Sequence, residues 1–411
     1  MMKNTHGKHT NMLVLVAALG YFVDIYDLVL FSVERIDSLK EILGASAAAD
    51  EIKNIGIQLL NWQMGGMLVG GLVWGIYGDK KGRLSVLFGS ILMYSLANIA
   101  NGFVQTVEQY ALLRFISGFG LAGELGAGIT LVSESMSKEK RGIGTMIVAT
   151  VGVFGAVVAG FMGDFITNWR HSFFLGGAMG LVLLIMRIGV FESGMFESIK
   201  REKVEKGNLL LLLKSPVNLI KYLGIIAVAV PVWYVMGILI TFSPEMMKAM
   251  GVTYFTPDPG KAIMFAYLGI TFGDFLSGML SQLLRSRKVV LGIFLVMTIL
   301  SVVLYFALAP KSELMFYGII TVVGIATGYW AVFMSTAAEL FGTNIRATVT
   351  TTAPNFVRGS VIFLTLGFRY LETSAGTVTA AIIIGVITFV IAFVALYKLE
   401  ETFHKDLNYV E

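Results

Sequence analysis

The sequence contains no cysteine, which excludes disulfide bonds, thiolate metal sites and catalytic thiols. Its four histidines are dispersed and form no metal-ligand cluster, so no metal site is expected. Charged residues are also scarce: they make up 14% of the 411 residues, whereas an average soluble domain has about 25%. Because so few charges cannot cover a water-soluble surface, the composition excludes a soluble enzyme, a disordered chain and a nucleic-acid-binding module.

Apolar residues dominate the rest of the chain. Hydrophobic residues make up 56% of it, and 46 glycines accompany them. A bilayer core of about 30 Å needs about 20 apolar residues per helix. Runs of that length between polar breaks predict an all-α membrane protein with twelve transmembrane helices. The predicted spans are residues 12–33, 57–78, 84–104, 108–133, 142–166, 171–191, 217–243, 262–284, 288–309, 313–338, 346–368 and 375–398.

Lysine and arginine indicate the orientation and the domain boundaries. An inside N-terminus puts roughly two thirds of the 31 Lys and Arg residues on the cytoplasmic side, Arg187 among them. Both termini are therefore expected to be cytoplasmic, in a multi-pass protein of the cytoplasmic (inner) membrane. Residues 192–216 carry mixed charges and predict a cytoplasmic linker. The predicted domains are a six-helix bundle at 1–191, a second bundle at 217–398 and a tail at 399–411.

The two halves of the chain repeat each other. Glu134 and Arg141, seven residues apart after the fourth span, recur as Glu339 and Arg346 after the tenth. The loop after the second span has a degenerate counterpart after the eighth. Parallel repeats with a site between the halves are typical of one large class of secondary transporter.

The loop after the second span contains Gly75, Gly78, Asp79, Lys80, Lys81, Gly82 and Arg83. This pattern resembles the loop signature of the major facilitator superfamily. Two branches of this superfamily, the metabolite–proton symporters and the sugar porters, have similar patterns at residues 114–126 and 134–141 and at the pair Tyr26–Asp27. Residues 339–349 match the superfamily's pattern for the loop after the tenth span. The resemblance implies two pseudo-symmetric six-helix bundles that work by alternating access.

The resemblance also implies gating residues at the inner membrane face. An acid–arginine cluster there would tie the bundles together and break when the inside opens, although the sequence itself shows only that these charges lie at one face. In the second half Gln282 stands where the first half has Asp79, so the second copy of the network is expected to be weaker. The implied gating residues are Gly75, Asp79, Arg83, Glu134, Arg141, Glu339 and Arg346.

Ionisable residues inside the spans are the candidate functional residues, because each costs at least about 2.5–3.5 kcal/mol at mid-bilayer. At about 1.5 Å per helical residue, Asp27 and Arg114 fall at one depth in the first and fourth spans, which predicts an ion pair. That pair is either a proton-coupling device, in which Arg114 releases Asp27 as the helices move, or a static contact that sets helix register. The six candidates are Asp24, Asp27, Arg114, Glu124, Asp274 and Arg358.

Asp24 and Glu124 are further candidates for proton coupling. Asp24 lies three residues before Asp27 on the same helix face. Two like charges so close do not ionise together readily, so one is expected to hold a proton. The alternative is a hydrogen bond from Asp24 to a neighbouring span. Glu124 either relays a proton inward or bonds a helix end near the inner gate, with the gate preferred. Asp274 receives no role.

Arg358 is the candidate substrate anchor. It lies near the midplane of the eleventh span without an acid on its own helix to neutralise it, and its planar fork suits a carboxylate or phosphate. The resemblance also implies a basic residue in this part of the span. The alternative is an ion pair with Asp274 or with an acid of the first span. Four other residues are expected to line the substrate site, or else to pack between helices: Asn355, Gln63, Tyr234 and Trp330.

These features predict a secondary transporter that carries a small hydrophilic, anionic metabolite together with a proton. It is expected to work as a monomer in contact with membrane lipid, with the proton as coupling ion and no cofactor. Neither an enzyme nor nucleic-acid binding is expected. Two alternatives remain open within transport: an exporter of metabolites or drugs working as an antiporter, and a uniporter of a neutral solute such as a sugar. A membrane sensor on the same fold is the alternative outside transport.

Overall fold

A computed structural model describes residues 2–81, 83–126, 128, 132, 141–192 and 215–405, and over this part the chain is helical without a β-strand. We call the described residues up to 192 the first half and those from 215 the second half. The first half contains α1 (Met2–Leu43), α2 (Ala49–Lys81), α3 (Arg83–Asn101), α4 (Val107–Leu121), α6 (Arg141–Phe165) and α7 (Trp169–Glu192). The second half contains α9 (Pro216–Tyr234), η2 (Val235–Ile240), α10 (Ser243–Ala249), α11 (Pro259–Leu284), α12 (Arg287–Leu308), η3 (Ala309–Lys311), α13 (Glu313–Thr327), α14 (Trp330–Glu339), α15 (Thr343–Ala375) and α16 (Thr377–Lys398).

The helices confirm the predicted all-helical transmembrane class. Within the described residues, eight helical stretches are long and apolar enough to cross a membrane. The remaining predicted spans lie on α2, α3, α4 and α15, which are shorter or more polar. Helices α1 and α15 run well beyond the predicted spans of residues 12–33 and 346–368.

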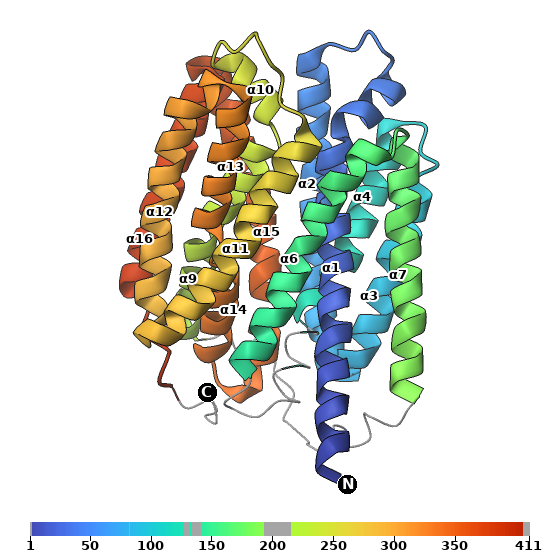
Figure 1. Ribbon diagram of the computed structural model, residues 1–411, viewed down its shortest axis with the longest axis vertical. Helices are drawn as coiled ribbons and strands as arrows, with labels where there is room; N and C mark the ends of the chain where they lie inside the picture. Colours follow the sequence, from blue (N-terminus) through green and yellow to red (C-terminus); the bar gives the residue numbers. More distant parts are fainter. Residues whose placement is uncertain are drawn as a thin grey trace.

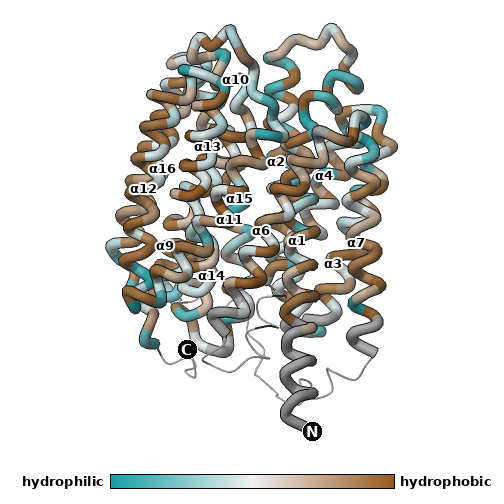
Figure 2. The backbone as a smooth tube through the Cα atoms, viewed as in Figure 1, coloured by the Kyte–Doolittle hydropathy of each residue, from teal (hydrophilic) through white to brown (hydrophobic). Residues whose placement is uncertain are grey.

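The two halves lie side by side, and both termini are at the same end of the molecule (Figure 1). Hydrophobic residues follow the middle of the helices, and hydrophilic residues gather toward their ends (Figure 2). Helix α11 of the second half packs along α6 of the first, and α15 packs along α2. The predicted linker 192–216 lies almost wholly outside the described residues, so the domain boundaries stay a prediction.

Glycines allow the closest helix contacts. A Cβ at Gly66 or Gly70 of α2 would collide with backbone atoms of α4, and one at Gly269 or Gly273 of α11 would collide with the backbone of α13. Small residues at such crossings let membrane helices approach closely and gain van der Waals contact. These glycine rows are packing faces.

Two of the predicted spans are interrupted. The seventh passes from α9 into a π-helical turn, η2, directly after Tyr234. The tenth breaks between the end of α13 at Thr327 and the start of α14 at Trp330. Broken membrane helices occur where the freed backbone groups find partners inside the protein. Both interruptions lie next to the centre of the molecule, where the halves meet.

Candidate functional site

The two halves bring a buried arginine and a buried aspartate together. Arg358 of α15 and Asp24 of α1 are 1% and 0% exposed, and Nη2 of the arginine lies 3.7 Å from Oδ2 of the aspartate. This separation is an ion pair but is too long for a hydrogen bond. Within the described part of the chain, Nε and Nη1 of Arg358 and both oxygens of Asp24 have no hydrogen-bond partner. Arg358 is thus paired with an acid of the first span, as in the alternative interpretation, yet keeps donors available.

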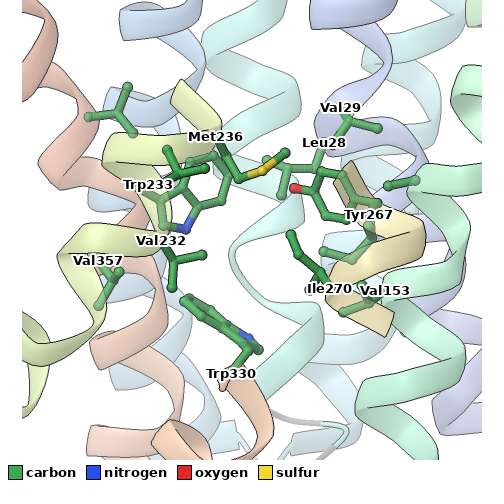
Figure 3. Packing of buried hydrophobic residues seen from close by; sticks show 14 of the residues in the cluster. Leu28, Val29, Val153, Val232, Trp233, Met236, Tyr267, Ile270, Trp330 and Val357 are labelled. Atoms are coloured by element: carbon green, nitrogen blue, oxygen red, sulfur yellow. The ribbon is translucent and has the colours of Figure 1, made fainter. Parts of the chain in front are cut away.

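Aromatic side chains surround this pair. The Arg358 guanidinium carbon lies 6.0 Å from the centre of the Trp330 ring. Figure 3 shows Trp233, Tyr267 and Trp330 pointing toward the middle of the view from α9, α11 and α14, with Leu28 of α1 beside Tyr267. The indole N–H of Trp330 has no hydrogen-bond partner among the described residues. Apolar and aromatic walls with a few polar atoms are typical of small-molecule sites. We call Asp24, Arg358, Trp233, Tyr267 and Trp330 the central cluster.

Tyr234 has the contacts of the alternative interpretation, in which it packs between helices. Its hydroxyl donates to the backbone carbonyl of Ala381 at 2.9 Å, and its ring packs against Gly385 and Phe389 of α16. Consecutive helical residues point about 100° apart, so the neighbouring Trp233 faces the centre instead. The sequence placed both residues at the right depth but did not show which of them turns inward.

Asn355 and Gln63 are each committed at one end to a backbone carbonyl. Nδ2 of Asn355 donates to the carbonyl of Ala122 in the first half at 2.8 Å, as well as to Thr351 of its own helix. Nε2 of Gln63 donates to the carbonyl of Leu28 at 3.0 Å. Their side-chain oxygens, Asn355 Oδ1 and Gln63 Oε1, are buried and have no partner in the part of the chain the structure describes. The side-chain amides of Asn355 and Gln63 therefore connect neighbouring segments through their N–H groups, and each keeps one oxygen that can accept a further hydrogen bond.

The predicted ion pair between Asp27 and Arg114 is not formed, although both residues belong to the described chain. Nη2 of Arg114 instead donates to Oδ1 of Asn98 at 2.7 Å, and its guanidinium carbon lies 4.7 Å from the centre of the Phe173 ring. Asp27 packs against Gly176 of α7. Asn98 lies beside the Asp27 carboxyl as well, so both charged groups lie next to this amide instead of forming a direct pair.

Glu124 has a partner that the sequence did not indicate. It forms a buried, two-pronged ion pair with Arg187 of α7. Gly20 of α1 lies against both side chains, where a Cβ would collide with them. The Lys/Arg count had placed Arg187 on the cytoplasmic side, yet its side chain is 1% exposed. Neither alternative for Glu124 describes this contact, which joins α1, α7 and the residues directly after α4 within the first half.

Asp274, which had no predicted role, lies at the break in the tenth span. It is fully buried on α11, and Oδ1 accepts a hydrogen bond from the backbone N–H of Ala331 at 3.1 Å. This amide belongs to the first turn of α14. Asp274 therefore bonds the start of a helix and is not the partner of Arg358.

Ion pairs also join the halves at the end of the molecule opposite the termini, which we call the distal end. Arg35 of α1 bonds both carboxylate oxygens of Glu245 of α10, at 2.7 and 3.1 Å. Lys53 of α2 lies 3.0 Å from Glu372 of α15. These two contacts, the distal pairs, were not predicted. Their residues lie in or next to the long polar connections, so the sequence offered charges there without indicating partners.

Breaking the Arg35–Glu245 pair is expected to open the distal end. Because the chain has no cysteine, a Leu28→Cys variant provides a single reactive thiol facing the centre. In intact cells, adding Glu245→Gln should raise the rate of labelling by a membrane-impermeant maleimide about tenfold, as expected for the loss of about 1.4 kcal/mol of attraction between the halves.

The matched control is Glu313→Gln, which removes an exposed acid at the start of α13 and should leave the labelling rate unchanged. The double variant Arg35→Gln/Glu245→Gln removes the pair without leaving an unpaired buried charge, and it should label as fast as Glu245→Gln. Equal rates in the parent and in both pair variants would show that the Arg35–Glu245 pair does not hold this end closed.

The gating residues expected at the other end are only partly described. The side chains of Asp79, Arg83 and Arg141, and all of Glu134, lie outside the described residues. Gly75 faces α15, where a Cβ would meet the Thr352 side chain at 3.4 Å. Their gating role stays a prediction.

The second copy of this network has its own partners. Glu339 pairs with Arg287 at 3.0 Å and accepts a hydrogen bond from Thr402 at 2.8 Å. Nε of Arg346 donates to the carbonyl of Ala338 at 2.7 Å. These contacts connect α12, α14, α15 and the chain after α16 within the second half. That the second copy of the network is weaker than the first stays a prediction.

The segment after α16 folds back along the same rim. Glu401 accepts a hydrogen bond from the backbone N–H of Arg287 at 2.8 Å. The hydrogen bond and the charge of Lys405, 2.7 Å away, hold the pKa of the Glu400 carboxyl below its usual value. Near neutral pH the Glu400 carboxylate therefore stays charged and paired with Lys405.

The chain is similar to known membrane transporters. A family model described as "Major Facilitator Superfamily" matches residues 17–365. The 3-(3-hydroxy-phenyl)propionate transporter of Escherichia coli strain K12 is 28% identical, over 76% of this chain and 77% of its own length. The niacin transporter NiaP of Acinetobacter baylyi is 28% identical, over 46% of this chain and 42% of its own. A solved structure of the proton:xylose symporter XylE bound to 6-bromo-6-deoxy-D-glucose has a TM-score of 0.72 at 14% identity and covers 98% of both chains.

Proposed function

This chain belongs to the Major Facilitator Superfamily, and on that premise we propose that it is a proton-coupled importer of small carboxylates that carry an aromatic ring. The family and the relatives are transporters, so the prediction of a multi-pass membrane transporter rather than an enzyme is confirmed. The substrate, the coupling ion and the direction are the proposal. We also propose that the protein is a monomer in the cytoplasmic membrane, that both termini are cytoplasmic, and that it uses no cofactor.

One observation carries the substrate class: Arg358 is buried between the halves with hydrogen-bond donors that no described residue satisfies. A buried donor without a partner is costly, and a guanidinium matches a carboxylate with two parallel hydrogen bonds. The Trp330 ring beside it offers an aromatic face. A carboxylate bound to Arg358 would therefore bring an attached ring next to the central aromatic side chains.

The relatives support the same chemistry. Niacin and 3-(3-hydroxyphenyl)propionate, named in the descriptions of two relatives, each combine one carboxylate with one aromatic ring. Such molecules need a cation for one end and an apolar or aromatic wall for the other. The central cluster contains both.

The Asp24–Arg358 pair supports proton coupling. When Asp24 is ionised, the pair is neutral, and adding a substrate anion leaves a net negative charge in a buried site, which is unfavourable at low dielectric. When Asp24 is protonated, Arg358 is free to pair with the substrate and the site is neutral again. Substrate and proton therefore bind together. Because Asp24 and Arg358 lie on different halves, this exchange also alters the attraction between the halves.

An antiporter and a sugar uniporter are the competing functions. Neither requires an unsatisfied arginine beside an aspartate at the centre, and a neutral sugar would leave the guanidinium without a charge partner. The rings of Trp233, Tyr267 and Trp330 point toward the middle of the view (Figure 3), which suits a ring with one polar end better than a molecule polar on all sides.

The proposal is tested by ligand-dependent thermal unfolding of the purified protein. Benzoate, nicotinate and 3-(3-hydroxyphenyl)propionate should raise the apparent Tm by about 2 °C or more at saturating concentration, because a ligand that binds the folded state stabilises it by mass action. Xylose, nicotinamide and benzamide are the neutral controls and should leave Tm unchanged.

Proteoliposomes then test coupling and direction. Labelled benzoate should accumulate inside above its outside concentration when the outside is more acidic. This accumulation should stop when a protonophore removes the proton gradient. Stabilisation by xylose alone, or uptake that ignores the gradient, would contradict the proposal.

A further inference from the structure

The break in the tenth span starts a new helix inside the protein. Helix α13 ends at Thr327, and α14 begins at Trp330 after Gly328 and Tyr329. The first N–H groups of any helix lack partners within it. In the described structure Tyr329, at the N-cap position, bonds the carbonyl of Val228 with its hydroxyl and provides no side-chain hydrogen bond to the start of α14. The start of α14 therefore depends on a neighbouring helix.

Asp274 of α11 provides that bond. Its Oδ1 lies 3.1 Å from the backbone nitrogen of Ala331, and a carboxylate next to a helix N-terminus also interacts favourably with the helix dipole. Gly273 and Gly328 make this possible, because a Cβ on either would collide with the other's backbone. The second oxygen, Oδ2, is buried without a partner among the described residues. The carboxylate is thus held by one helix end.

The residue at the start of α14 belongs to the central cluster. Trp330 is its first residue, and its ring lies 6.0 Å from the Arg358 guanidinium carbon. Ile270 and Tyr267 lie one and two turns before Asp274 on α11 and point toward the same centre (Figure 3). Helix α11 therefore supplies one wall of the site directly and holds a second wall, Trp330, through Asp274.

We propose that Asp274 is a positioning residue for the aromatic part of the substrate: it anchors the first turn of α14 and thereby fixes the Trp330 indole against which the substrate ring stacks. This inference rests on the proposed function for the identity of the ring, while the positioning of Trp330 is a property of the protein alone. Asp274 does not touch the substrate carboxylate, which Arg358 binds.

Fluorescence of Trp330 tests the positioning without a ligand. The chain has five tryptophans, so a parent with the other four replaced by phenylalanine reports Trp330 alone. Asp274→Ala removes the acceptor and should increase quenching of Trp330 by acrylamide about twofold. Asp274→Asn keeps an acceptor oxygen and should match the parent. If the Asp274→Ala variant does not fold, Asp274→Ser replaces it, because the shorter serine side chain does not reach the backbone amide of Ala331. Equal quenching in the parent and in the acceptor-less variant would overturn the proposal.

Ligand selectivity tests the consequence. Binding of benzoate and of cyclohexanecarboxylate, which share a carboxylate and differ in ring character, is measured by calorimetry on otherwise wild-type protein. Asp274→Ala should reduce the preference for benzoate about fivefold, and Asp274→Asn should retain it. In a Trp330→Leu background, Asp274→Ala should change the preference no further, because both substitutions remove the same interaction.

The two proposals fail in different ways. Wild-type protein that binds neither acid contradicts the proposed function, and the fluorescence result then decides the positioning role. An equal preference for benzoate in the wild-type protein and in Asp274→Ala supports the proposed function and contradicts the role given to Asp274.

Discussion

Replacement of Arg358 by alanine is expected to lower the affinity for benzoate at least about a hundredfold. Truncating one partner of a buried, hydrogen-bonded charge pair costs about 2–5 kcal/mol, and about 2.7 kcal/mol corresponds to a hundredfold change. Arg358→Lys keeps the charge but loses the planar fork, so it should retain part of the affinity. Calorimetric titration of the purified variants with benzoate provides the measurement.

Two variants separate binding from stability in this experiment. Arg369→Ala removes an exposed arginine from the same helix and should bind benzoate as the parent does. Arg358→Ala alone leaves Asp24 buried without its ion-pair partner, which is destabilising. Arg358→Ala/Asp24→Asn removes both charges and should fold well while still failing to bind. Full affinity in this double variant would show that Arg358 is a structural pair partner and not the substrate anchor.

Replacement of Asp24 by asparagine is expected to abolish accumulation of substrate against its gradient. Asparagine resembles the protonated aspartate, so Arg358 stays available for the substrate whatever the pH. In the parent, affinity should rise as pH falls, because the proton that neutralises Asp24 is taken up with the substrate. In Asp24→Asn, affinity should be high and independent of pH. Exchange of labelled for unlabelled benzoate should continue, whereas uptake driven by a proton gradient should be lost.

Asp37→Asn, at an exposed position of the same helix, is the control and should accumulate substrate normally. Asp27 provides the contrast. It lies one turn from Asp24, yet the structure shows Arg114 bonded to Asn98 rather than to Asp27. Should Asp27→Asn uncouple transport while Asp24→Asn does not, the proton would bind inside the first half, and the competition for Arg358 would be the wrong mechanism.

The contacts between the halves suggest how binding and movement are connected. The Arg35–Glu245 and Lys53–Glu372 pairs join the halves at the distal end, and Asp24–Arg358 joins them at the centre. A substrate that takes Arg358 from Asp24 removes the central attraction. The distal pairs then become the remaining described charge contacts between the halves, so their strength sets how readily that end separates.

The depth of a residue in the membrane and the apolar character of each span could be predicted well from the sequence, whereas the contact partners of the charged side chains could not. Arg358 is predicted near the midplane of its span, and its buried side chain meets Asp24 of the other half. Glu124 was assigned to the inner half of its span without Arg187, because Arg187 looked like a loop residue at the end of a helix. Tyr234 and Trp233 are adjacent in the sequence, and only their rotation about the helix axis distinguishes the residue that packs on α16 from the one that faces the centre.

The sequence by itself determined that this is an all-helical membrane protein of two related halves that belongs to a family of transporters. It could do so because each membrane helix satisfies its own backbone hydrogen bonds and buries its own apolar residues, so spans are recognisable one at a time. Only the tertiary structure decided that Arg358 meets Asp24, that Arg114 meets Asn98, and that Asp274 holds the start of α14. Such pairs depend on which faces of two helices meet, and that is set by the packing of the whole bundle.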